Sequence, residues 1–212
     1  MLVLGDAHAV EPERRRALRS AYEASGATTA LQLGDLMYYD LPVPTWFIAG
    51  NNEDLDVIDA LRAGEHPPGT ENANLLHSTT VDLDGVRFAG LSGNFAPTQY
   101  DKQRTHLHGD RRRHFVRDDV EAAKRLADVD VLLSHEAPNG LLQYEHYDPG
   151  CDQVDDILDA LDPDLCLVGH HHEHLEMTYR ETRVVGLDAA WRSYYELDTT
   201  DLSLERFETP DA

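Results

Sequence analysis

One short pattern occurs five times along the chain: an apolar run, a small residue, and then a side chain that can bind a metal. A short apolar run bounded by turn residues predicts a buried strand. The five side chains that follow these runs belong to Asp6, Asp35, Asn51, His135 and His170. In open α/β sheets the carboxyl ends of parallel strands converge on one crevice, where such folds bind ligands. The pattern therefore predicts parallel strands whose ends assemble a metal site.

The first third of the chain alternates apolar runs with amphipathic segments. Residues 11–25 are expected to form a helix, because Pro12 stands near its start and Gly26 can end it. Residues 54–63 are expected to form a second helix. The expected strands are 1–5, 28–33 and 45–49. Such a β-α-β-α-β order favours a parallel sheet with right-handed crossovers.

The alternation of strands and helices stops after a Pro-Pro-Gly loop. Residues 73–82 and 85–91 are expected to form strands around Asp84-Gly85, which is a hairpin turn signal, and to supply the antiparallel part of a second sheet. Residues 92–116 are polar and irregular, and a loop of that length in a compact domain is usually functional or mobile.

The last part of the chain again alternates helices and strands, and it then ends in a series of strands. Helices are expected at 117–128 and 152–161, and strands at 130–133 and 165–168. Four further strands are expected near 176–180, 183–187, 191–197 and 202–207. In the strand 191–197, Trp191 is expected to lie in the core or on the sheet surface rather than to contact substrate.

Acidic residues dominate the charge balance: 40 Asp and Glu stand against 18 Lys and Arg, which gives a formal net charge of -22. Such a surface repels itself at low salt, whereas molar salt screens its charges within about 3 Å. We interpret the composition as halophilic, an adaptation to a high-salt cytoplasm; an acidic surface that repels acidic partners is the alternative. Binding to a nucleic-acid backbone is disfavoured.

Length and hydropathy favour one soluble domain. No apolar run approaches the ~20 residues that span a bilayer, and the chain begins at Met1 without a basic or cleavable apolar leader. We therefore expect a cytoplasmic protein without a membrane partner, organised as a single domain over residues 1–212. Its two cysteines, Cys151 and Cys166, are too few for a disulfide framework.

The types of donor limit the choice of metal. Around the five strand ends lie seven candidate ligands, which offer carboxylate oxygen, amide oxygen and imidazole nitrogen: Asp6, His8, Asp35, Asn51, His135, His170 and His172. Mixed N/O ligation suits Mn, Fe, Zn, Co or Ni better than Mg or Ca alone. Seven ligands exceed the needs of one ion, so we expect two divalent cations, with Mn as the first choice. Such a pair binds a hydroxide and clamps a phosphoryl group during in-line displacement.

These motifs resemble the calcineurin-like metallophosphoesterase family. The resemblance rests on Asp6-Ala7-His8, Gly34-Asp35, Gly50-Asn51-Asn52-Glu53, His135 and Gly169-His170-His171-His172, in the family's order. It implies a four-layer α/β/β/α sandwich of two mixed sheets. It also implies that Asp6, His8, Asp35 and His172 hold the first ion. The second ion would be held by Asp35, Asn51, His135 and His170, with Asp35 bridging the pair.

One position departs from the family pattern. The resemblance places a histidine after the ligand Asn, where this chain has Asn52. An amide can donate a hydrogen bond but cannot deliver a proton to a leaving group. We expect Asn52 to act as an electrostatic donor to the phosphoryl oxygens. Two alternatives are a substitute histidine, either in the 92–116 loop or at His171, and weak catalysis limited to good leaving groups.

The sequence thus predicts a dinuclear metal-dependent phosphoesterase in which a metal-bound hydroxide attacks a phosphomonoester or phosphodiester. We expect a small phosphoester or nucleotide as substrate. A non-catalytic metal-binding scaffold and a nuclease acting on DNA or RNA ends are the alternatives. A phosphate clamp is conceivable in the 92–116 loop, because Arg forks match phosphate oxygens, although pairing with surface carboxylates is equally consistent. The candidate substrate-binding residues are His106, His108, Arg111, Arg112 and Arg113.

Overall fold

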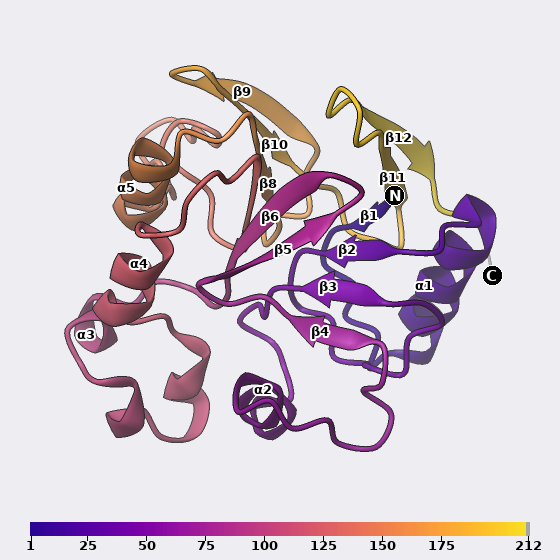
Figure 1. The fold of residues 1–212 in the computed structure, drawn as a ribbon, viewed down its shortest axis with the longest axis horizontal. Helices are drawn as coiled ribbons and strands as arrows, with labels where there is room; N and C mark the ends of the chain where they lie inside the picture. The colour runs from indigo at the N-terminus through magenta and orange to yellow at the C-terminus, as the bar shows by residue number, and fades with distance from the viewer. Residues whose placement is uncertain (211–212) are drawn as a thin grey trace.

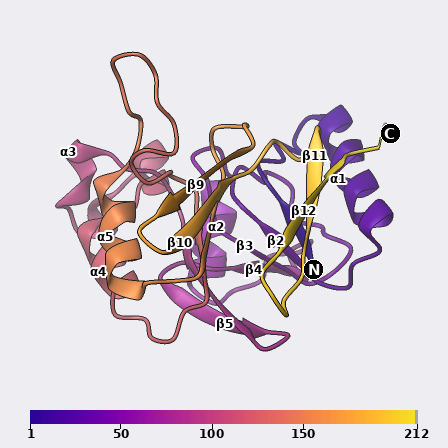
Figure 2. The same cartoon turned by 90° about the horizontal axis from the view of Figure 1, so that it is seen from above.

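The computed structural model describes residues 1–210 and contains two six-stranded sheets packed face to face (Figure 1). Helices cover the outer faces, with α1 on one side and α4 and α5 on the other (Figure 2). The layers are therefore helix, sheet, sheet, helix, as the sequence predicts. No helix among residues 1–210 is long and apolar enough to cross a bilayer.

The first sheet has the strand order β12-β11-β1-β2-β3-β4. Its parallel part consists of β1 (Leu2–Leu4), β2 (Ala30–Gln32), β3 (Thr45–Phe47) and β4 (Ala73–Leu75). The antiparallel strands β11 (Ser193–Leu197) and β12 (Leu204–Glu208) complete it.

The second sheet has the order β5-β6-β7-β8-β10-β9. Its central strands β6 (Val86–Leu91), β7 (Val131–Ser134), β8 (Leu165–Val168) and β10 (Thr182–Gly186) are parallel. The edge strands β5 (Thr79–Leu83) and β9 (Leu175–Tyr179) are antiparallel to their neighbours.

The expected strand 73–82 is wrong as a single element. Residues 73–75 form β4, which runs parallel to β3 in the first sheet, whereas β5 begins at Thr79 in the second sheet. The chain crosses between the sheets at 76–78, where Ser78 adopts a left-handed φ of 53°. The Asp84-Gly85 hairpin between β5 and β6 is confirmed.

Most helix positions follow the local signals, although the helix expected at 117–128 ends at Ala123. The helix α1 (Pro12–Ser25) ends at Gly26, whose left-handed φ of 59° suits a residue without Cβ. The Asp54 carboxylate accepts hydrogen bonds from two backbone N–H groups at the start of α2 (Leu55–Arg62). The remaining α-helices are α3 (Pro97–Tyr100), α4 (Arg117–Ala123) and α5 (Asp152–Leu161). The 92–116 segment is thus more ordered than expected, since it also contains the 3-10 turns η1 (Arg104–His106) and η2 (Gly109–Arg113).

Both faces of the central strands are buried, which explains why these strands are mostly apolar. In β1, Leu2 and Leu4 face the layer beneath α1 and α2, while Val3 faces the other sheet. In β8, Leu167 faces the first sheet and Val168 faces α4 and α5. Because side chains alternate along a strand, every central strand contributes to two cores. The two cysteines are buried, free thiols in the outer core of the second sheet.

Candidate metal centre

The predicted donors come from both sheets. Asp6 and His8 follow β1, Asp35 follows β2, and Asn51 follows β3, all in the first sheet. The second sheet contributes the histidines after β7 and β8. The structure brings Asp6, Asp35 and His135 together, and it does so where the strand ends of two packed sheets meet rather than at the edge of one sheet.

The turns that present the donors are conformationally unusual. Four candidate ligands have a left-handed backbone: His8 (φ 44°), Asp35 (φ 49°), His170 (φ 71°) and His172 (φ 55°). Such a conformation costs free energy for a residue with a side chain, and it persists only where the surrounding structure enforces it. Clustering of this strain at one place is typical of a functional site.

Two glycines are required by close packing around the centre. A Cβ at Gly34 would lie 2.3 Å from His135 Nδ1, and a Cβ at Gly50 would lie 2.2 Å from Asp35 Oδ1. Each distance is shorter than any van der Waals contact. The small residue in the repeated sequence pattern therefore lets a neighbouring ligand approach the backbone.

Three buried side chains form the middle of the site. Asp6, Asp35 and His135 each offer one ligand atom, and these atoms all lie within 4.8 Å of one another. Asp6 and His135 are 0% exposed and Asp35 is 2% exposed. Two carboxylates and an imidazole packed this closely away from water form a suitable site for a cation.

The Asp6 carboxylate provides the clearest test of whether a cation fits. Both of its oxygens are buried, and neither has a hydrogen-bond partner. The nearest nitrogens are His172 Nε2, 3.2 Å from Oδ2, and His135 Nδ1, 3.6 Å from Oδ1. Burying an unpartnered carboxylate is costly unless the group is paired or binds a metal. The residues present therefore fit a bound divalent cation.

Asp35 is shared between the two halves of the site. Its Oδ2 lies 3.4 Å from His8 Nε2, and its Oδ1 lies 3.8 Å from His135 Nε2. Asn52 donates to both oxygens, through its backbone N–H (2.6 Å) and its side-chain Nδ2 (2.7 Å). The amide of Asn52 thus orients the candidate bridging ligand, and its predicted contact with a phosphoryl oxygen stays a prediction.

His135 is oriented by the opposite sheet. Its Nδ1 lies 2.9 Å from the carbonyl of Leu33, which can only accept, so Nδ1 carries a proton and donates. Its Nε2 lies 3.0 Å from Asn51 Oδ1. Burial lowers the pKa of His135, whereas the charges of Asp6, Asp35 and Glu136 and the hydrogen bond to Leu33 together raise it, so the net shift is upward. A cation at Nε2 would have to compete with a proton there.

The remaining histidines lie at the rim. The His170 ring centroid lies 4.9 Å from that of His135, and burial lowers the pKa of His170. His8 and His172 pack edge to face, with centroids 5.3 Å apart. Both also contact Trp191, at 5.7 Å and 5.1 Å. Trp191, which the sequence places in the core or on the sheet surface, therefore lies directly against two candidate ligands.

Surrounding polar groups hold the ligand turns. The Glu53 carboxylate accepts from the backbone N–H groups of Leu36 and Met37 and from the hydroxyl of Tyr39 (2.6 Å). Burial raises the pKa of Glu53 to about 7. Gln32, a polar residue inside an apolar run, donates to the carbonyls of residues 5 and 34. The sequence analysis gave Gln32 no role, although a buried amide in a strand is itself a signal.

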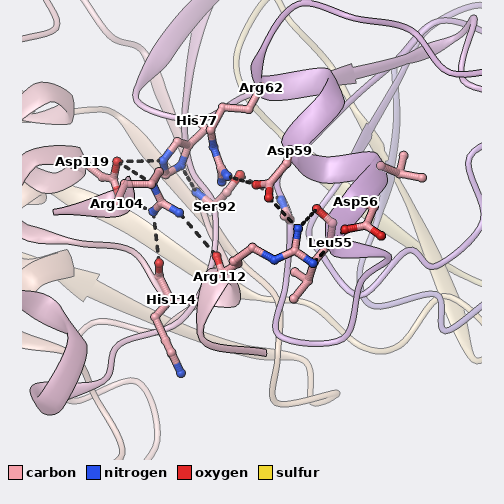
Figure 3. A network of polar contacts seen from close by, with 12 residues as sticks. Leu55, Asp56, Asp59, Arg62, His77, Ser92, Arg104, Arg112, His114 and Asp119 are labelled. Carbon is pink, nitrogen blue, oxygen red and sulfur yellow. Dashed lines mark hydrogen bonds and ion pairs between the residues drawn. The ribbon is translucent and has the colours of Figure 1, made fainter. Parts of the chain in front are cut away.

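The arginine cluster makes different contacts from those expected of a phosphate clamp. Arg112 pairs with Asp56 (2.8 Å) and Asp59 (2.7 Å) of α2 (Figure 3). Arg113 contacts Asp110, and Arg111 is exposed. His106 and His108 are exposed as well. Among the described residues, no side-chain hydrogen bond or ion pair of these five joins them to a candidate ligand, so the clamp stays a prediction.

Comparisons with known proteins agree with this architecture. Residues 1–174 match the model of the calcineurin-like phosphoesterase family. A lariat debranching enzyme of Schizosaccharomyces pombe is 27% identical over 173 residues, which cover 66% of this chain and 36% of the enzyme. An uncharacterized protein of Haemophilus influenzae is 27% identical over 158 residues, 64% of each chain. The alignments thus cover less than two thirds of both relatives.

A solved structure shares the whole fold. The crystal structure of the protein TT1561 of Thermus thermophilus superposes with a TM-score of 0.69 at 18% identity, covering 99% of this chain and 98% of that one. Since the family model spans the segment that carries all seven candidate donors, the chain belongs to the calcineurin-like phosphoesterase family.

Proposed function

We propose that this protein is a dinuclear metal-dependent phosphoesterase that hydrolyses a small phosphomonoester or phosphodiester. The observation that carries the proposal is the buried Asp6 carboxylate, unpartnered at both oxygens, beside the shared Asp35. Membership of the phosphoesterase family supports the same reaction class.

Each candidate ligand has a place in this proposal. One cation would be held by Asp6, His8, Asp35 and His172, and the other by Asp35, Asn51, His135 and His170. The donors mix carboxylate, amide and imidazole, which suits Mn first, with Fe, Zn, Ni or Co as alternatives. Bound there, the cations would supply a nucleophile at neutral pH and offset the charge of the phosphoryl oxygens.

Residues outside the ligand set hold the ligands in place and influence substrate preference. Asn52 holds Asp35 through two hydrogen bonds, and Glu53 fixes the following turn by accepting from Leu36 and Met37. Because Asn52 cannot supply a proton, esters whose leaving group departs as a stable anion should react fastest.

A screen of metals against substrates tests the proposal. Protein stripped with a chelator should be inactive and should recover with Mn²⁺ on a nitrophenyl monoester or on a linear or cyclic diester. No recovery with any metal on any of these esters would favour the non-catalytic scaffold. A lariat substrate belongs in the screen, because one relative is a lariat debranching enzyme, although the net charge of -22 disfavours nucleic acid.

The composition determines the conditions of the assay. We infer that the acidic surface is adapted to a salty cytoplasm, where counterions screen the repulsion among its carboxylates. The thermal midpoint of unfolding should therefore rise as KCl increases from about 0.1 M to the molar range. A midpoint that is flat or falls with salt would contradict halophilic adaptation.

A further inference from the structure

Two hydrogen bonds tie the sheets together beside the candidate metal centre. The backbone N–H of Ala49 donates to Ser92 Oγ (2.9 Å), and the N–H of Gly93 donates to the Ala49 carbonyl (2.7 Å). Ala49 follows β3 in the first sheet and stands two residues before Asn51, whereas Ser92 follows β6 in the second sheet. Both polar backbone groups of Ala49 are thus held by the opposite sheet.

This connection matters because the site combines donors from both sheets. Asn51 follows a strand of the first sheet and His135 follows a strand of the second, yet Asn51 Oδ1 and His135 Nε2 lie 3.0 Å apart. Ligand–metal bonds are about 2 Å long and tolerate errors of only a few tenths of an ångström. A contact that fixes β3 against β6 therefore fixes the position of Asn51 relative to His135.

Ser92 is itself held in place by a buried histidine. Its hydroxyl donates to the carbonyl of Leu76 (2.8 Å), so the hydroxyl both accepts and donates. Its backbone N–H donates to His77 Nδ1 (3.3 Å). Since Nδ1 accepts, the proton of the neutral His77 ring is on Nε2, which lies 3.1 Å from Asp119 Oδ1.

The far end of this chain of contacts is fixed by α4 and the preceding loop. Asp119 is bound by the guanidinium of Arg104 (Figure 3). It also accepts from the backbone N–H of Val116 (2.8 Å). The His77 side chain is only 8% exposed. A buried histidine that accepts a hydrogen bond at Nδ1 and lies at ion-pair distance from a carboxylate at Nε2 is restricted in orientation, so it helps to specify where Ser92 lies.

We propose that His77 and Ser92 are positioning residues for Asn51, acting through Ala49, and that they set the affinity of the second cation, the one assigned to Asn51 and His135. The inference rests on the proposed function, because it requires that two cations bind. It assigns a role in metal binding to the Asp119–His77–Ser92 chain, which lies outside the ligand set.

Two substitutions at one position separate positioning from simple stabilisation. In His77→Asn, the side-chain oxygen can replace Nδ1 as the acceptor for the Ser92 N–H, while the contact with Asp119 is lost. In His77→Gln, the longer amide can replace Nε2 and still donate to Asp119, while the acceptor for Ser92 is lost. If His77 only stabilised the fold, both variants should bind the second cation with the same affinity. The positioning role instead predicts that only His77→Gln lowers the affinity for the second cation.

The experiment is titration of chelator-stripped full-length protein with Mn²⁺, followed by calorimetry and electron paramagnetic resonance. Wild type and His77→Asn should bind two ions and show the spectrum of a spin-coupled pair. His77→Gln should bind one ion normally and the other about 10-fold more weakly, the lower end of the cost of removing an outer-shell partner. At limiting Mn²⁺ it should therefore show the spectrum of isolated ions.

Control variants keep the test decisive. Arg117→Gln, at the start of α4, breaks an exposed ion pair with Asp101 without touching Ser92, so it should bind two ions like wild type. Should His77→Gln fail to fold, as judged by thermal unfolding without metal, Ser92→Ala should show the same selective weakening. Wild-type Mn²⁺ binding in His77→Gln or Ser92→Ala, or equal losses in His77→Asn and His77→Gln, would overturn the inference while leaving the proposed function intact. Failure of wild type to bind two ions would overturn both.

Discussion

The two sides of the candidate metal centre are built by different means. On the Asn51–His135 side, hydrogen bonds orient each donor: His135 donates to Leu33, and the Asn51 turn is tied to Ser92 through Ala49. On the His8–His172 side, the two rings pack against each other and against Trp191. His135 is fully buried, whereas the His172 side chain is 31% exposed.

This difference follows from where each side lies. The buried side joins two sheets, so its polar groups must find partners inside the protein. The rim is partly open to solvent, so its imidazoles, which lie near the carboxylates of Asp6 and Asp35, depend less on hydrogen bonds inside the protein and more on packing to limit their motion. We therefore expect the buried side to depend on hydrogen-bond geometry and the rim to depend on the size of Trp191.

The largest effect should come from the ligand that belongs to both sides. Asp35→Ala should remove both cations and lower hydrolysis by about 10³-fold or more, because each cation stabilises the transition state by several kcal/mol. Metal analysis and turnover of a nitrophenyl ester measure this. Asp118→Ala, at an exposed carboxylate of α4, is the control. Near-normal turnover of Asp35→Ala would exclude the bridging role.

The next effect concerns the missing proton donor on the buried side. Asn52→His should raise turnover of alkyl phosphoesters by about 10-fold or more relative to nitrophenyl esters, since general acid catalysis typically contributes 10²–10⁴-fold. The ratio of the two rates is the measurement, because it cancels any loss of cations caused by removing the hydrogen bond from Asn52 to Asp35. An unchanged ratio would mean that leaving-group protonation does not limit the rate or comes from another group.

On the rim, Trp191→Ala should weaken binding of one cation by about 10-fold, whereas Trp191→Phe should preserve it. The ring restrains His8 and His172 through packing, and phenylalanine keeps most of that contact. In a Trp46→Phe background, Trp191 is the only tryptophan, so its fluorescence should change as Mn²⁺ binds. Equal affinities in the alanine and phenylalanine variants would show that the rim needs no aromatic support.

The smallest effect is the pH dependence of stability at the buried side. Burial lowers the pKa of His77 despite the opposing effect of Asp119; Arg62 and Arg104 lower it further. Histidine in the unfolded chain has a pKa of about 6.5, so below that pH the unfolded chain binds a proton that folded His77 does not. The stability that comes from keeping His77 neutral is therefore fully present above pH 6.5 and is lost as the pH falls.

Urea unfolding of metal-free protein between about pH 7 and pH 5 measures the effect. Wild type should lose free energy of unfolding more steeply than His77→Gln, by no more than about 1.4 kcal/mol per pH unit, the limit for one proton. Parallel curves would show that His77 ionises as readily in the folded protein as in the unfolded chain.

Local signals in the sequence predicted much of this molecule. Gly26 and Asp54 marked helix boundaries, Asp84-Gly85 marked a hairpin, and the repeated strand ends marked the donors. These features depend on residues close together in the chain, where turn chemistry and the alternation of burial act directly. The break between β4 and β5 escaped prediction because sheet membership depends on which distant strand each segment pairs with.

Residue type and local pattern were enough to predict the candidate donors and their order, the alternation of strands and helices, and the acidic surface, whereas the four-layer sandwich was implied by the family resemblance. Only the tertiary structure decided that the donors come from two sheets, that Arg112 binds α2 carboxylates, that Asn52 holds Asp35, and that Trp191 packs on two candidate ligands. Those contacts join residues far apart in the chain. Their partners are chosen by how the sheets pack, which no local pattern specifies.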